Sequence, residues 1–143
     1  MHHLTLDAAR TIVEAALAHA GAQGLKPLAI VALDARGCIK AALAQDGTSL
    51  KRFEIAHGKA YGALALGIGS RAVGAMAADR PHFVAAVTHA VGGALVPVPG
   101  GVLIRDGAGA LLGAVGISGD TSDNDESAAK AGITAAGLGA DAG

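Results

Sequence analysis

Aromatic side chains are scarce in this sequence of 143 residues. Tryptophan is absent, and the aromatic residues are one tyrosine and two phenylalanines, whereas alanine occurs 35 times and glycine 22 times. Full burial of a large apolar side chain contributes roughly 1.5–3 kcal/mol, and alanine contributes much less. A domain with so few large side chains must pack its backbones closely, and burial in an oligomer adds stability by mass action. We therefore expect a homo-oligomer.

Cysteine is nearly absent as well. Cys38 is the single copy, so an internal disulfide is excluded and a reducing compartment fits. The first ten residues contain no apolar stretch after a basic region, and so do not resemble a secretory signal. These two absences predict a cytoplasmic protein.

An excess of charge of one sign is also lacking. The chain has 11 basic and 12 acidic residues, for a net charge of −1. A nucleic-acid-binding domain normally shows a basic face, so no nucleic-acid partner is expected. Residues 83–104 carry no formal charge and have the length of a membrane span. Because Pro97 and Pro99 would interrupt a helix there, we expect a helix end, a turn and a buried strand, and no membrane partner.

The apolar pattern predicts one domain, residues 1–143, of helices and antiparallel strand pairs. Helices are expected over residues 5–20, from about 48 to 64, over 81–90 and from Ser122 onward, the last with Ser122 and Asp125 as a capping box. Strands are expected over residues 28–33, 38–44, 101–105 and 111–117. Because the strands come in antiparallel pairs and not as βαβ crossovers, the fold class is α+β.

Metal-binding and catalytic motifs are not evident. An acidic cluster, Asp120, Asp123, Asp125 and Glu126, lacks the spacing of a calcium loop. We interpret it as neutralising the positive end of the last helix, with a weak cation site as the alternative. No histidine pair has the i, i+4 spacing of a helical zinc site, and no serine lies in a nucleophile elbow. Residue chemistry alone predicts no metal and identifies no enzyme.

The C-terminal third resembles the signature of the GlcG/HbpS family. The segments that carry the resemblance are Pro99–Ile104, Gly109–Leu112, Gly113–Gly119 and Asp123–Glu126, with Glu54–Ala56 and Lys59–Ala60 upstream. The resemblance spans nearly the whole chain. It implies a profilin-like α+β fold, with a five-stranded antiparallel sheet flanked by helices, usually built into a higher oligomer.

Several functions follow from this resemblance. Family members are associated with haem binding, and some with slow haem degradation. Others lie beside glycolate or other catabolic enzymes, or form the C-terminal domain of PduO-type proteins, fused to a cobalamin adenosyltransferase. Three hypotheses remain open: a haem-binding protein, a binder or modest catalyst for a small catabolic metabolite, and an accessory or assembly subunit without its own ligand.

A haem site needs an iron donor, an apolar slot and cations for the propionates. The candidate cofactor-binding residues are the donors His57 and His89, the cations Lys59 and Arg71, and Gly100 and Gly101 as a pocket wall. Glycines without a Cβ, including Gly113 and Gly116, leave space for a ligand or for the close approach of another backbone.

Overall fold

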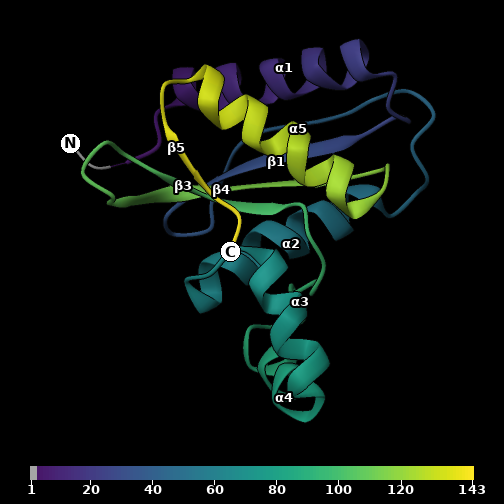
Figure 1. Ribbon diagram of the computed structural model, residues 1–143, viewed down its shortest axis with the longest axis vertical. Coiled ribbons are helices and arrows are strands. Elements are labelled where there is room, and N and C mark those ends of the chain that lie inside the picture. The colour runs from purple at the N-terminus through teal and green to yellow at the C-terminus, as the bar shows by residue number, and fades with distance from the viewer. Residues whose placement is uncertain (1–2) are drawn as a thin grey trace.

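The computed structural model describes residues 3–143. Its strands form one antiparallel sheet, and helices lie on both faces of that sheet (Figure 1). The helices are α1 (Leu6–Gln23), α2 (Arg52–Leu66), α3 (Ser70–Asp79), α4 (Pro81–Ala90) and α5 (Ser122–Ala135). The strands are β1 (Ala29–Asp34), β2 (Ile39–Ala44), β3 (Gly101–Arg105), β4 (Leu111–Ser118) and β5 (Gly139–Asp141). The α+β class and the five-stranded antiparallel sheet are thereby confirmed.

The sheet has the strand order β2-β1-β4-β3-β5. Both hairpins predicted from the sequence form, and they meet where β1 pairs with β4. Every residue of β1 is buried, because helices lie on both sides of this strand. β2 is an edge strand and alternates between exposed and half-buried residues.

The two faces of the sheet have different cores. Helices α1 and α5 cover one face, where the core contains large side chains such as Ile12, Ile30 and Ile133. Helix α2 covers the other face mainly through Ala56, Ala60 and Ala63. Small side chains on α2 bring its backbone close to the sheet, which is the packing that the composition requires.

Glycines in the sheet make this close approach possible. A Cβ at Gly116 would lie 1.9 Å from the backbone oxygen of Ala56, and one at Gly101 would lie 2.2 Å from that of Lys59. Both positions therefore serve the close approach of a backbone, one of the two roles expected for glycines in these strands.

Three details differ from the sequence-based expectations. Helix α3 and strand β5 were not predicted from the apolar pattern, and α2 begins at Arg52 rather than near residue 48. The N-cap of α5 is Thr121, whose hydroxyl accepts the backbone N–H of Asn124 at 3.2 Å. The predicted capping box is therefore wrong, because Asp125 lies one residue beyond the position that closes such a box.

Helices α3 and α4 project from the body below α2 (Figure 1). They have a small core of their own around Val73, Val84 and Leu95. The uncharged stretch 83–104 divides as expected, since α4 ends at Ala90 and β3 begins at Gly101. Across residues 3–143, no helix combines the length and apolar character needed to cross a membrane.

Substitution of Gly116 by alanine tests the close packing of α2. We expect a loss of about 1–3 kcal/mol in the free energy of unfolding, because the added methyl group overpacks a site bounded by backbone. Gly21→Ala is the matched control: Gly21 lies within α1, and a Cβ there would meet nothing within 4 Å. That control should gain about 0.4–1 kcal/mol. Urea unfolding measures both, and equal stability of the two variants would contradict the packing.

Candidate functional site

A buried ion pair joins α2 to α5 near the end of the sheet. The side chains of Lys59 and Asp125 are 3% and 1% exposed, and their Nζ and Oδ2 atoms lie 3.1 Å apart. Lys59 Nζ also donates to the backbone oxygen of Ile117 at 2.9 Å, and Asp125 accepts the N–H of Asp120 at 3.0 Å. Burial lowers the pKa of Lys59, and the charge of Asp125 opposes that shift. The pair fixes α2 to the chain segment that leads from β4 into α5.

The Lys59 side chain fills the space that the glycines beside it leave open. A Cβ at Gly100 would lie 2.9 Å from Lys59 Nζ, and the N–H of Gly101 donates to Ser70 Oγ at 2.7 Å. Four candidate residues, Lys59, Arg71, Gly100 and Gly101, thus come from neighbouring segments of the fold, with Arg71 directly after Ser70. The space beside the pocket wall expected of Gly100 and Gly101 is therefore filled by this chain's own Lys59.

Arg71 forms ion pairs with two carboxylates of α5. Its Nε and Nη2 atoms donate to the two oxygens of Glu126 at 3.0 and 3.2 Å, and Nη2 also donates to Asp123. Hydrogen bonds to Glu126, then to Asp123, raise the pKa of Arg71. The interpretation of the acidic cluster as helix neutralisation is therefore incomplete, because three of its members also pair with cations from α2 and α3.

Asp120 holds the loop before α5. Its carboxylate accepts Asn124 Nδ2 at 2.7 Å and the backbone N–H groups of Lys26 and Thr121 at 2.8 Å. The hydrogen bond from Asn124, followed by those two backbone donors, lowers the pKa of Asp120 to about 2. Within the described residues, no group of three or more histidine, cysteine or acidic side chains is arranged to hold a metal ion.

A second region, on the opposite flank of α2, is open and apolar. Ile39, Ala42 and Ala44 of β2 pair with Leu33, Val31 and Ala29 of β1, whose side chains face α2. These three β2 residues are exposed, Ile39 by 53%. On α2, Phe53 and Tyr61 pack at the margin of the core that includes these β1 residues, and the His57 ring lies between them. We call the surface of these six residues the α2–β2 face.

His57 lies in the middle of a row of rings on this face. Its ring stacks on Phe53 at a centroid distance of 6.0 Å and on Tyr61 at 5.4 Å, with interplanar angles of 29° and 24°. The side chain is half-buried, and its nitrogens have no hydrogen-bond partner among residues 3–143. An imidazole held between rings with free nitrogens can donate a lone pair to a ligand.

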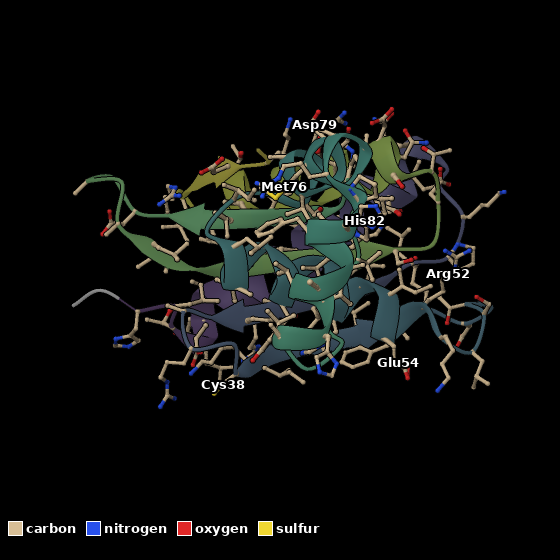
Figure 2. All side chains as sticks on the ribbon, turned by 90° about the horizontal axis from the view of Figure 1, so that it is seen from below. Cys38, Arg52, Glu54, Met76, Asp79 and His82 are labelled. Carbon is tan, nitrogen blue, oxygen red and sulfur yellow. The ribbon has the colours of Figure 1, made fainter. Side chains whose placement is uncertain are left out.

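The other candidate donor, His89, lies apart from this row. It is exposed near the end of α4, and α4 packs against α3 at a distance from the sheet (Figure 1). Figure 2, which views the molecule from below, labels His82 and Met76 in the same projecting unit. The structure therefore does not bring His57 and His89 into one site.

Sequence reasoning missed the aromatic neighbours of His57 and the exposed residues of β2. The signal for the first was present, because residues 53, 57 and 61 recur every four positions on a predicted helix. The exposed residues of β2 could not be recognised without the pairing register between β1 and β2. A cavity of about 140 Å³ touches this region beside Gly37 and Tyr61. That volume is below the roughly 300–1,000 Å³ of ordinary ligand pockets, so the α2–β2 face is an open surface.

Comparison with known proteins relates the chain to one family. A family model described as "Haem degrading protein HbpS-like" matches residues 4–134. The crystal structure of HbpS is similar with a TM-score of 0.80 and 26% identity, covering 94% of this chain and 90% of that one. A double mutant of Streptomyces reticuli HbpS gives 0.79 and 25%, covering 94% and 87%.

A complex of PduOC with haem is similar in fold, with a TM-score of 0.84 at 23% identity, covering 96% of this chain and 97% of that one. No sequence among the curated proteins matches the chain significantly.

The buried ion pair is tested by a double-mutant cycle. We expect Lys59→Met to lower the free energy of unfolding by about 3–5 kcal/mol, because it leaves the Asp125 carboxylate buried without its cation. The double variant Lys59→Met/Asp125→Leu should be more stable than that single variant, because both charges are gone. Lys130→Met is the control: its partly exposed pair with Glu126 spans 3.5 Å and should contribute less than about 1 kcal/mol. Additive losses in urea unfolding would show that Lys59 and Asp125 are not coupled.

Proposed function

The chain belongs to the HbpS-like family of haem-degrading proteins, and we propose on that basis that it binds haem on the α2–β2 face, with His57 as the iron ligand. The observation that carries the proposal is the half-buried His57 ring, which is stacked between two aromatic side chains and has no hydrogen-bond partner among the described residues. Bound haem would supply an iron centre for ligand or electron chemistry.

The residues of the face fit the needs of a haem. The rings of Phe53 and Tyr61 and the exposed Ile39 give an apolar wall beside the donor. The aromatic stacks hold the imidazole in place, which reduces the entropy lost when a ligand binds to it. Exposed cations lie near both ends of the wall, Arg36 beside the Tyr61 end and Lys51 before Phe53. Carboxylates on the rim of a bound macrocycle would meet these cations.

The alternative residues fit less well. The amine of Lys59 is buried and paired with Asp125, so it does not reach a ligand on the surface. Arg71 is held by Glu126 and Asp123 on the α5 side of the molecule. His89 is exposed on a helix that lies away from the sheet and has no aromatic neighbour in the described chain. His57 is therefore the preferred donor.

An absorbance titration with haemin tests the iron ligand. We expect His57→Ala to shift the Soret band and to weaken binding by on the order of tenfold or more, because a direct ligand is lost and even the indirect partners of metal ligands contribute about 10–100-fold. His89→Ala is the matched control and should keep the wild-type spectrum and affinity.

Repeating the haemin titration at lower pH gives a second test of the iron ligand. Binding by the wild type should weaken as the pH falls, because a protonated imidazole has no lone pair for iron. The pH dependence should be smaller in His57→Ala. If both histidine variants keep the wild-type Soret position and affinity, coordination by His57 is wrong, and a small catabolic metabolite becomes the better hypothesis for the ligand.

A further inference from the structure

We propose that the end of the β1–β2 hairpin holds a binding site for a small organic carboxylate, on the side of the sheet that α1 covers. The site is a cavity of about 430 Å³, within the roughly 300–1,000 Å³ of ordinary ligand pockets. It shares none of the six residues of the α2–β2 face, so the proposal goes beyond haem binding and does not rest on it. The residues that line the cavity are His3, Leu4, Asp34, Ala35, Arg36 and Lys40.

A β-bulge turns Lys40 into this cavity. The next residue of β2, Ala41, packs on the core between the sheet and α1, so strict alternation would put residue 40 on the α2 side. The register instead pairs Ile39 with Leu33 and leaves Lys40 without a partner in β1. A bulge of this kind re-aims a side chain, and Lys40 lines the cavity together with Leu4, which belongs to the core under α1.

Lys40 brings a charge to the cavity that nothing in the described chain compensates. The residue is half-buried, and among residues 3–143 its ammonium group has no hydrogen bond or ion pair. A partly dehydrated ammonium group is costly unless an anion or another acceptor replaces the lost water. An edge-strand lysine often serves to keep other strands away, but that role needs neither a bulge nor a cavity. An anionic ligand accounts for both.

The one carboxylate among the lining residues is already engaged. Asp34 Oδ1 accepts the backbone N–H groups of Arg36 at 2.9 Å and of Cys38 at 3.0 Å, and Oδ2 lies 3.6 Å from the Arg36 guanidinium. Burial acts to raise the pKa of Asp34, but the hydrogen bonds from Cys38 and Arg36 and the charge of Arg36 outweigh it, so the pKa is lowered. Asp34 therefore holds the turn, and Arg36 balances its charge.

The charge that remains selects an anion. Since Arg36 balances Asp34, Lys40 leaves the cavity with a net positive charge, and His3 adds a further basic group. The Arg36 side chain is 82% exposed, and a guanidinium has five N–H donors, so it keeps donors for a ligand. A carboxylate has two oxygens and can accept from a guanidinium and an ammonium group at once.

The apolar part of the cavity favours an organic ligand. Leu4 is 1% exposed and, with Ala35, contributes the aliphatic part of the lining. An inorganic anion the size of a few water molecules, at about 30 Å³ each, would leave most of the cavity to water. A carboxylate with a compact apolar body fills more of the space and removes apolar surface from water.

Titration of the haem-free, full-length protein with benzoate, followed by heteronuclear NMR, tests the site. Benzoate carries a carboxylate on a compact apolar body, and benzamide has nearly the same shape without the charge. We expect benzoate to shift the backbone amide resonances of residues 34–40 with a dissociation constant on the order of 1 mM or below. Benzamide and inorganic phosphate should each bind at least about tenfold more weakly, because one lacks the charge and the other the apolar body.

Substitution of Lys40 by glutamine tests the cation that the bulge supplies. Lys40→Gln should weaken benzoate binding by about tenfold or more, because a charge-assisted hydrogen bond is lost. Lys26→Gln is the matched control: Lys26 is exposed just before the start of β1, at the other end of that strand from the cavity, and the affinity should stay unchanged.

Circular dichroism shows whether both lysine variants are folded, and the comparison of benzoate with benzamide and phosphate needs no variant. Equal binding of benzamide or of phosphate would overturn the proposal. So would benzoate shifts confined to residues outside the cavity lining and the β1–β2 turn, or a folded Lys40→Gln variant with the wild-type affinity.

Discussion

The close approach of α2 to the sheet is the constraint on which the rest of the structure depends. At Gly101 and Gly116 the helix backbone occupies the place of a side chain, so neither position accepts a Cβ without movement. Alanines at the contact let the helix lie close to the sheet, and they explain how a chain with three aromatic residues builds a core on this face of the sheet. Because α2 lies over β1, β3 and β4, the side of β2 that faces the same way stays exposed, and Phe53 and Tyr61 pack at the margin of the core under α2. The candidate site is therefore a consequence of the packing.

The Lys59–Asp125 pair is the polar counterpart of this contact. Removing two charges from water costs several kcal/mol per ion, so the pair is not by itself a source of stability. Its geometry nevertheless joins three segments, because Lys59 reaches Ile117 and Asp125 while Asp125 receives the N–H of Asp120. An apolar pair would fill the same volume without selecting these partners. The ion pair thus ties the position of α2 to the start of α5.

The sequence predicted the fold well where local patterns are strong. The stripe of α1, the two hairpins and Pro81 at the start of α4 each have a local physical cause, and the structure contains all of them. Helix α3 was missed because its N-cap, Gly69, offers no side-chain signal, whereas α4, of the same length, begins at Pro81. Strand β5 consists of Gly139, Ala140 and Asp141, residues with low strand propensity, and it exists because β3 offers a free edge.

The site was less predictable for a different reason. A glycine in a strand is compatible with a ligand, a side chain or a neighbouring backbone, and the sequence does not state which of them fills the space. Here Lys59 fills the space at Gly100, so a residue predicted to form a pocket wall packs against the protein's own side chain. The spacing of Phe53, His57 and Tyr61 was visible in the sequence. Which residues of β2 lie on the same side of the sheet depends on the register between β1 and β2, which the sequence does not give.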